Sequence, residues 1–138
     1  ALIIRTNFFG VGPNYKPSFS DIITSALKCN QKIKLFNDVF FTPIHIHELA
    51  DIVLELLKEN KKGIYNVVSN ERISKYDFGI LIAESLNLPK SLILEGSISK
   101  RKDLVKRPKD MSLSNDKLKT KLNIKINTIS NQIKCLTE

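Results

Sequence analysis

The segment 40–59 most constrains the fold of this chain, because a short apolar run there leads directly into a strongly patterned helix. Pro43 removes a backbone donor and holds the preceding residue extended, so residues 40–46 are predicted to form a strand or sheet-edge segment. From Glu48 onward, apolar residues recur at helical spacing and charged residues fill the other face. This pattern predicts an amphipathic helix with Leu49, Ile52, Val53, Leu56 and Leu57 on its apolar side.

Strand and helix signals alternate along the rest of the chain. Apolar and β-branched runs predict strands at 1–4, 33–36 and 64–68, the first of them buried on both faces as in a parallel sheet. Capping signals predict further helices that begin at Ser18, Ser74, Ser114 and Thr128. The unpatterned segments 6–14 and 97–109 are predicted to be loops, the second one basic and mobile. The alternation indicates an α/β domain.

Two of these helices carry more detailed signals. In the helix after Ser18, Asp21 stands in capping-box position, and the apolar face is predicted to contain Phe19, Ile22, Ile23, Ala26 and Leu27. In the helix after Ser114, Leu118 and Leu122 form an i,i+4 pair, and Asn123 takes the place where a left-handed residue would end the helix.

The size and charge of the chain limit the choice of partners. Its 138 residues are expected to form one domain, residues 1–138, and the abrupt start at a strand favours a piece of a longer protein with a further half before Ala1. The net charge of +8 favours anionic partners, but the basic residues are scattered and lack interleaved aromatics, so a nucleic-acid partner is not expected. Cys29 and Cys135 have no metal-ligand spacing, which favours reduced, cytoplasmic thiols, and no apolar run is long enough for a membrane span.

Motifs for several common chemistries are absent from the sequence. It contains no Gly-x-Gly-x-x-Gly, no P-loop, no Gly-x-Ser-x-Gly and no Tyr-x-x-x-Lys, so no catalytic residue is assigned and the chain alone is predicted to be inactive. His45 and His47 would share one face of a strand and could chelate a metal, but no third ligand is evident. No metal site is therefore predicted, and His47 is expected to cap or flank the helix.

Four segments carry a family resemblance when they are taken in order: 2–10, 41–50, 63–67 and 107–118. Together they resemble the C-terminal half of extended short-chain dehydrogenases, and most of all dTDP-4-dehydrorhamnose reductases and related sugar-nucleotide reductases. In that family, an N-terminal Rossmann half binds NAD(P) and supplies the catalytic Tyr and Lys. The resemblance implies that this chain is the substrate-binding part and that its terminal strands complete a parallel sheet.

The resemblance also implies roles for individual residues. The loop after the first strand would line the junction between nicotinamide and sugar, with Asn7 and Phe8 on the NADP or NAD cofactor. Arg107 would contact the nucleotide diphosphate, for which a guanidinium fork is well suited. The implied substrate-binding residues are Thr6, Asn7, Phe41, Thr42 and Arg107. Asn7 could equally satisfy only loop backbone groups, and Arg107 could be an ordinary surface arginine.

Several functions remain open at this point. The first is reduction of a keto-sugar on a nucleotide diphosphate, as in dTDP-rhamnose biosynthesis, by the intact oxidoreductase. A non-catalytic subunit of the same fold is an alternative, since the regulatory β subunit of methionine adenosyltransferase resembles these reductases. An NAD-dependent sugar-nucleotide epimerase or dehydratase is another, although relatives acting on UDP-sugars often carry an arginine near Phe41, and this chain has none. A homodimer is compatible with each of them.

Overall fold

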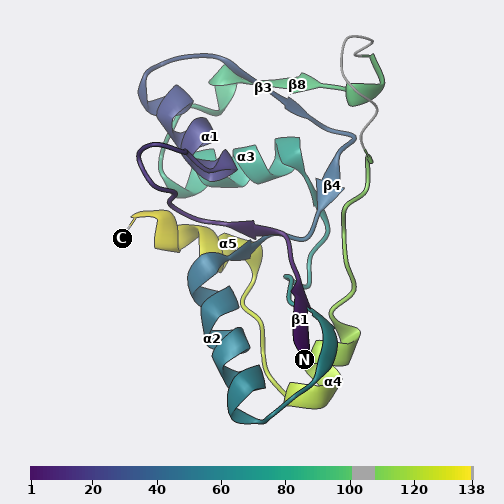
Figure 1. Cartoon of the computed structure of the whole chain (residues 1–138). Helices are drawn as coiled ribbons and strands as arrows, with labels where there is room; N and C mark the ends of the chain where they lie inside the picture. The colour runs from purple at the N-terminus through teal and green to yellow at the C-terminus, as the bar shows by residue number, and fades with distance from the viewer. Residues whose placement is uncertain (101–107, 138) are drawn as a thin grey trace.

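The computed structural model describes residues 1–100 and 108–137, in which strands and helices alternate (Figure 1). Its strands are β1 (Leu2–Arg5), β2 (Phe8–Phe9), β3 (Ile33–Phe36), β4 (Phe40–Phe41), β5 (Ile44–His45), β6 (Gly63–Asn66), β7 (Ile73–Ser74) and β8 (Ile93–Gly96). Its α-helices are α1 (Phe19–Lys28), α2 (Ile46–Lys58), α3 (Lys75–Ser85), α4 (Asp116–Leu122) and α5 (Ile129–Ile133). Short 3-10 helices are η1 (Lys90–Leu92), η2 (Ile98–Lys100) and η3 (Lys134–Thr137). Among the described residues, no helix has the length and apolar character needed to cross a membrane.

The strands pair two by two, and three of the four pairs are parallel. Strand β1 pairs with β6, β2 with β5, and β3 with β8, whereas β4 and β7 are antiparallel. Each parallel pair joins strands that are distant in sequence and separated by at least one helix, as parallel pairing requires. The predicted α/β class with parallel strands is confirmed.

One lobe of the molecule, the α1–α3 lobe, is built on the β3–β8 pair and lies at the top of Figure 1. Its core is aromatic: the ring of Phe78 on α3 contacts the rings of Phe9 and Phe41 edge-on, at centroid distances of 5.1 and 5.2 Å. A Cβ at Gly79 would overlap Cδ1 of Leu35, so the glycine lets α3 approach β3 closely. The α1–α3 lobe is therefore packed around one helix.

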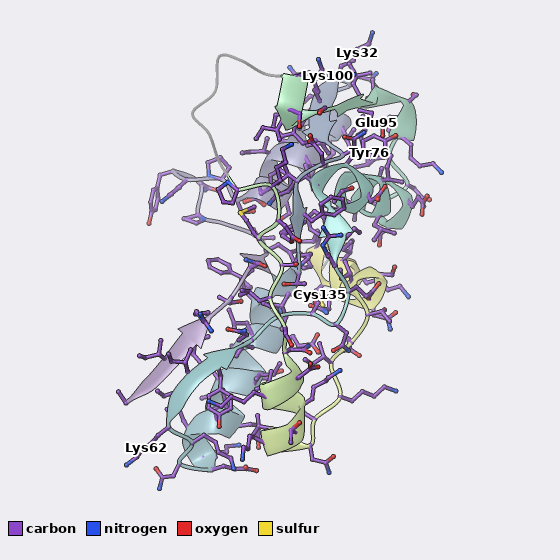
Figure 2. The ribbon with its side chains drawn as sticks, turned by 90° about the vertical axis from the view of Figure 1, so that its right-hand side faces the viewer. Lys32, Lys62, Tyr76, Glu95, Lys100 and Cys135 are labelled. Atoms are coloured by element: carbon purple, nitrogen blue, oxygen red, sulfur yellow. The ribbon has the colours of Figure 1, made fainter. Side chains whose placement is uncertain are left out.

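The other lobe, the α2–α4 lobe, is built on the β1–β6 pair. Ile52 and Leu56 of α2 share a core with Leu118 and Leu122 of α4, around the buried ring of Tyr65. Of the five apolar residues predicted on the buried face of α2, Ile52 and Leu56 are buried and Leu49 and Val53 are partly buried. Figure 2 shows the two lobes end to end, with Lys62 at the tip of the α2–α4 lobe and Lys32 and Lys100 at the far end of the other.

Strand β1 is covered on one face only. Leu2 and Ile4 pack against the core of the α2–α4 lobe. On the opposite face, Ile3 and its register partner Ile64 are 52% and 45% exposed. The prediction that this strand is buried on both faces is therefore wrong for this chain, because no described element covers the second face.

The predicted helix ends are largely confirmed. Ser18 and Asp21 form a capping box at the start of α1, and the hydroxyls of Ser74 and Thr128 cap α3 and α5. The residue at or just after the C-cap of the first four helices is left-handed, with φ between 49° and 57°, and is always asparagine: Asn30, Asn60, Asn87 and Asn123. Asparagine tolerates this conformation better than most residues with a Cβ, which explains its use where glycine is more usual.

Some boundaries and faces differ from the predictions. Helix α2 begins at Ile46, before Glu48, because the ring of His45 caps it. The predicted loop 6–14 contains the short strand β2. Ile22 and Leu57, placed on apolar faces, are 49% and 56% exposed. Helix α4 begins two residues after Ser114, with Asn115 at its N-cap.

The predicted basic loop 97–109 is only partly described, since residues 101–107 lie outside the described residues. At its start, Ser97 is followed directly by the helix η2. This part of the segment is therefore regular, unlike the prediction.

Candidate functional site

A pocket of about 550 Å³ lies on the α1–α3 lobe, bounded by β3, the first residue of α3, η2 and the segment 108–111. This volume falls within the range of roughly 300–1,000 Å³ that is typical of small-molecule sites. Two lysines, Lys34 and Lys75, line it. We call it the apolar pocket, because its other lining residues are all apolar: Phe19, Leu35, Phe36, Val39, Ile98, Pro108 and Met111.

Lys75 gives the apolar pocket an internal positive charge. It is the first residue of α3, and its Nζ lies 3.7 Å from the ring centroid of Phe41 and 4.4 Å from that of Phe19. Burial lowers the pKa of Lys75 from its ordinary value to about 8, because desolvation disfavours the charged form. Within residues 1–100 and 108–137, no carboxylate forms an ion pair with it.

Asp38 fixes the wall of the pocket that η2 forms. Its carboxylate accepts hydrogen bonds from the Ser97 hydroxyl (2.7 Å), the Ile98 N–H (2.8 Å) and the N–H and hydroxyl of Ser99. Burial would raise the pKa of Asp38, but these hydrogen bonds hold it well below its ordinary value. Asp38 therefore acts as a cap that orients Ile98 toward the pocket.

The wall formed by Pro108 and Met111 is joined to β4 by its backbone. The N–H of Phe40 donates to the carbonyl of Lys109 (2.7 Å), and the N–H of Met111 donates to the carbonyl of Phe40 (2.8 Å). The Lys109 ammonium also donates to the Ser99 hydroxyl, which ties this wall to η2. The described residues on either side of 101–107 therefore belong to two walls of the same pocket that are joined to each other.

An ion pair supports this attachment from the outside. Arg72 donates from Nε and Nη2 to Oδ2 of Asp110 (3.2 and 3.1 Å), and its guanidinium lies 3.8 Å from the ring centroid of Phe40. Hydrogen bonds from Ser112 and Arg72 lower the pKa of Asp110 to about 2. Asp110 is therefore ionised at neutral pH and available to both partners.

A second group of site residues lies where β2, β4 and β5 meet. Oδ1 of Asn7 accepts hydrogen bonds from the N–H (3.1 Å) and the hydroxyl (2.9 Å) of Thr42. The Thr42 hydroxyl in turn accepts from the N–H of Leu113 (3.2 Å), two residues after Met111 of the pocket wall. This junction, Asn7–Thr42–Leu113, connects the loop after β1 to the rim of the apolar pocket.

The neighbours of Asn7 differ in their surroundings. The hydroxyl of Thr6 is buried and has no hydrogen-bond partner among the described residues. The ring of Phe8 is 65% exposed. A buried hydroxyl without a partner is costly, so Thr6 is suited to receive a polar group from outside the described residues.

The structure brings together some of the residues that the sequence singles out. The junction contains or adjoins four of them: Thr6, Asn7, Phe8 and Thr42. The side chain of Asn7 accepts from the backbone N–H and the hydroxyl of Thr42, which agrees with the alternative that it satisfies loop backbone groups. Phe41 is 4% exposed and lies beneath the ammonium of Lys75, so it forms the layer behind the apolar pocket. Arg107, the predicted diphosphate contact, lies outside the described residues.

Sequence reasoning missed Lys75 and most of the pocket wall. One signal for Lys75 was available: it is a cation at the first position of a capped helix, where the helix dipole favours acidic residues. The apolar lining residues carried no such signal, because an apolar residue on a strand or helix normally packs in a core.

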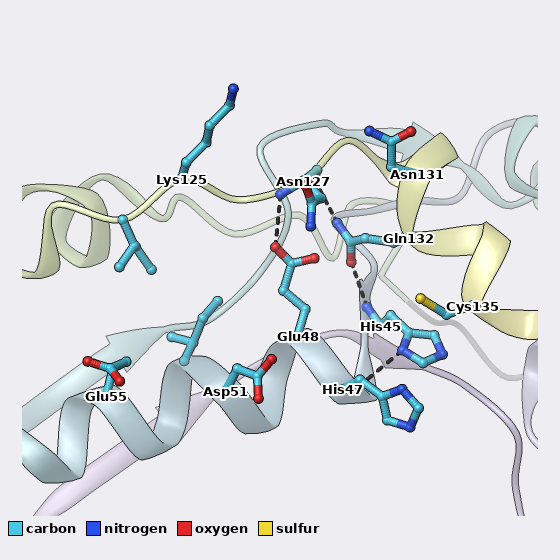
Figure 3. A pocket seen from close by; sticks show the side chains of 12 residues that line it. His45, His47, Glu48, Asp51, Glu55, Lys125, Asn127, Asn131, Gln132 and Cys135 are labelled. Carbon is cyan, nitrogen blue, oxygen red and sulfur yellow. Dashed lines mark hydrogen bonds between the residues drawn. The ribbon is translucent and has the colours of Figure 1, made fainter. Parts of the chain in front are cut away.

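The histidine pair lies in a separate cleft of about 400 Å³ between α2 and the segment 124–135 (Figure 3). Nδ1 of His45 accepts a hydrogen bond from the N–H of His47, so this pair forms the start of α2. Gln132 accepts from the N–H of His45 and donates to the carbonyl of Asn127, whose N–H donates to Glu48. Among the residues with described positions, no three His, Cys, Asp or Glu side chains are placed to hold a metal ion. The network therefore fastens α5 to α2.

Comparison with known proteins identifies relatives of the whole chain. The family model described as the RmlD substrate binding domain matches residues 1–138. A solved structure of a hypothetical dTDP-4-dehydrorhamnose reductase from Sulfolobus tokodaii is 31% identical, covers 92% of this chain and has a TM-score of 0.75. The dTDP-4-dehydrorhamnose reductase of Bacillus anthracis, solved in complex with NADP, covers 99% of this chain with a TM-score of 0.86 at 18% identity, which shows a shared fold.

A curated relative is similar over a shorter stretch. The probable low-salt glycan biosynthesis reductase of Haloferax volcanii is 30% identical over 96 residues, or 67% of this chain. This chain spans less than half the length of each of these relatives: 44% and 47% of the two solved structures and 32% of the curated protein.

Proposed function

This chain belongs to the RmlD substrate binding domain family, and we propose that it is the substrate-binding part of an NAD(P)-dependent sugar-nucleotide reductase. The intact protein would reduce a keto-sugar carried on a nucleoside diphosphate, as in dTDP-rhamnose biosynthesis. The observation that carries this proposal is the apolar pocket, which combines apolar walls with two lysines. A nucleotide has the matching composition of a flat base and an anionic diphosphate.

The pocket supports a specific orientation of the nucleotide. The base would lie against the apolar walls, and the diphosphate would extend toward Arg107, which directly precedes Pro108 of the pocket wall. A guanidinium matches phosphoryl oxygens in bidentate geometry. Phe41 and Thr42 would support the nucleotide from behind, Phe41 through its contact with Lys75.

The junction supports the position of the keto-sugar and of the nicotinamide. Thr6 offers a buried hydroxyl without a described partner, and Phe8 offers an exposed ring, so these residues fit the nicotinamide end of NADP or NAD. The cofactor supplies a hydride when it is bound. Asn7 would orient Thr42 at the edge of the sugar site through its two hydrogen bonds.

The remaining parts of the site are proposed to lie in a dinucleotide-binding half upstream of Ala1. The exposed face of the β1–β6 pair supports this arrangement, because a further layer packed there would bury Ile3 and Ile64. The catalytic acid would also come from that half, since this chain has no Tyr-x-x-x-Lys. Residues 1–138 would then act as a single substrate-binding unit.

Calorimetric titration of the full chain with dTDP, UDP and NADPH tests the proposal. We expect dTDP to bind, and Arg107→Ala to weaken its binding by about tenfold or more, the loss typical of a charge-assisted phosphate contact. Arg101→Ala is the matched control, because it removes the same charge from the same segment. The proposal is wrong if a folded chain binds none of the three ligands, or if both substitutions have the same effect.

A reductase assay of the complete gene product separates the proposed enzyme from a non-catalytic subunit of the same fold. We expect oxidation of NADPH or NADH that depends on a nucleotide-linked keto-sugar. Binding of dTDP without any such oxidation would favour a binding subunit instead.

A further inference from the structure

We propose that Lys75 determines the ligand class of the apolar pocket by pairing with a phosphoryl group, so that the pocket accepts nucleoside diphosphates and discriminates against uncharged nucleosides. This inference rests on the proposed function, because it names the group that is recognised at the same site. It concerns a residue that neither the sequence motifs nor the family resemblance singles out.

The ammonium of Lys75 lies in the wall of the pocket, over two aromatic rings. A lysine at a protein surface normally lays its stem on apolar neighbours and extends its charged end into water. Lys75 instead keeps Nζ over the rings of Phe41 and Phe19, at 3.7 and 4.4 Å from their centroids, in the wall of the pocket. The two rings offset part of the cost of desolvation, but they supply no negative charge.

The charged residues that line the pocket are both lysines. Lys34 on β3 is the second charged residue that lines it. Two carboxylates directly adjoin lining residues in the chain, and both are already engaged. Asp38 accepts hydrogen bonds from Ser97, Ile98 and Ser99. Asp110 is paired with Arg72. Among the described residues, the pocket therefore contains positive charge without an available acid, and a bound anion would supply the missing partner.

The position of Lys75 on α3 also favours an anion beside it. As the first residue of an 11-residue helix, it lies where the helix dipole is positive, although its own N–H already donates to the carbonyl of Val39 (2.9 Å). Placing a cation at this position is otherwise unfavourable. A bound anion would therefore offset the repulsion between this ammonium and the end of the helix.

The lining of the pocket is complementary to a ligand with an apolar part and an anionic part. The apolar walls suit a flat, uncharged body, and Lys75 and Lys34 suit an anionic end. A nucleoside diphosphate satisfies both parts. Thymidine would lose the ionic contact, and inorganic pyrophosphate would lose the apolar contacts.

Calorimetry on the full chain tests this inference with three probes: dTDP, thymidine and inorganic pyrophosphate. We compare Lys75→Met, which keeps a long apolar side chain, with Lys32→Met as the matched control. Lys32 is exposed at the tip of the same lobe and outside the pocket (Figure 2). Lys75→Met should raise the Kd for dTDP by about tenfold or more and change the Kd for thymidine less than about twofold. Lys32→Met should change neither.

The NMR signal of the Lys75 side chain provides an independent readout. Its Cε–Hε resonance is assigned by its absence in the Lys75→Met spectrum. We expect dTDP and pyrophosphate to shift this resonance and thymidine to leave it in place. The same spectra also show whether each variant is folded.

The outcomes separate this inference from the proposed function. If dTDP binds but the Lys75 resonance does not move, or if Lys75→Met weakens dTDP and thymidine equally, the inference is wrong while nucleotide binding stands. If pyrophosphate shifts the resonance but dTDP does not bind, Lys75 pairs with phosphoryl groups, whereas the proposed function and the preference for nucleoside diphosphates are both wrong. If no probe binds to the folded chain, both are wrong.

Discussion

At the scale of single residues, the surroundings of Lys75 disfavour its positively charged form. Its ammonium is largely removed from water, and it lies at the positive end of a helix dipole. The rings of Phe41 and Phe19 compensate for only part of this cost. Residues held in this way are frequent at functional sites, where binding of a ligand restores the missing interaction.

This arrangement predicts how stability depends on pH. The pKa of Lys75 is about 8 in the folded chain and 10.5 ordinarily, so between these values the unfolded chain binds more protons, and the free energy of unfolding rises with pH. Below pH 8 the charged lysine imposes its full cost. Lys75→Met should therefore raise the free energy of unfolding at pH 7 by about 1–2 kcal/mol, after discounting for the partly exposed side chain.

Urea denaturation at pH 7 and at pH 9.5 measures this effect. The advantage of Lys75→Met over the wild type should shrink at the higher pH, where the wild-type lysine is neutral. Lys32→Met should match the wild type at both pH values. An advantage of equal size at both values would contradict the assigned titration of Lys75.

Sequence patterns could not reveal Lys75, for a physical reason. Its role depends on the two rings above which it lies, and Phe19 and Phe41 come from segments that are more than 30 positions away in the sequence. Thr42 was singled out through the resemblance, but its bonding to Asn7 and Leu113 was not. Side-chain contacts between distant segments follow from the tertiary fold, which local patterns do not encode.

At the scale of elements, Asp38 holds η2 against the turn after β3. We predict that Asp38→Asn lowers the free energy of unfolding by about 1–2 kcal/mol at pH 7, because an amide accepts fewer of the hydrogen bonds from Ser97, Ile98 and Ser99. The pKa of Asp38 is lowered in the folded chain, so its contribution is complete above the ordinary value of 3.8 and is lost as the pH falls below it.

Urea denaturation at pH 7 and at pH 3 checks this prediction. The difference between wild type and Asp38→Asn should become smaller at pH 3. Asp51→Asn, at an exposed position in the interior of α2, is the control for a general effect of charge. An unchanged stability of Asp38→Asn at pH 7 would show that η2 does not depend on this carboxylate.

The left-handed asparagines predict a second effect at this scale. Asn87 follows the C-cap of α3 with φ of 55°, a conformation that is costly for β-branched residues. Asn87→Val should lower the free energy of unfolding by about 1–2 kcal/mol, whereas Asn87→Gly should be neutral or slightly stabilising. Thermal unfolding measures both, with Asn14→Val in an exposed loop as the control. Equal stability of the valine and glycine variants would contradict this explanation.

Elements were predictable where their signals are local. The caps at Ser18, Ser74 and Thr128 involve residues within three positions of one another, so the sequence alone predicts them. Strand β2 was missed because it consists of two residues that are ordered by pairing with β5. The exposure of Ile22 was also missed, because periodicity predicts an apolar face without saying how wide a surface the neighbouring elements cover.

At the scale of the whole molecule, two lobes with separate cores meet at the junction, and one face of the β1–β6 pair is uncovered. The sequence predicted the α/β alternation and a strand at 1–4, which the structure places at Leu2–Arg5. It could not predict which face of that strand is covered, since an apolar run looks the same in an edge pair and in the middle of a sheet.

The uncovered face predicts the solution behaviour of the chain. Ile3 and Ile64 lie side by side and exposed, so the isolated chain should self-associate through them. Ile3→Lys should reduce the weight-average mass in sedimentation velocity toward that of the monomer. Leu94→Lys, which replaces a 40% exposed apolar residue on the other lobe, should have no such effect. A monomeric wild type at high concentration would rule out association through this face.

The measurement that tests the central claim most directly is a methyl NMR map of dTDP bound to the full chain. We expect shifts in the methyl groups of Leu35, Val39 and Ile98, which line the apolar pocket, and none in Ile52 and Ile124, which line the histidine cleft. A folded chain in which saturating dTDP shifts only the cleft methyl groups, or no methyl groups at all, would contradict the assignment of this pocket to a sugar nucleotide.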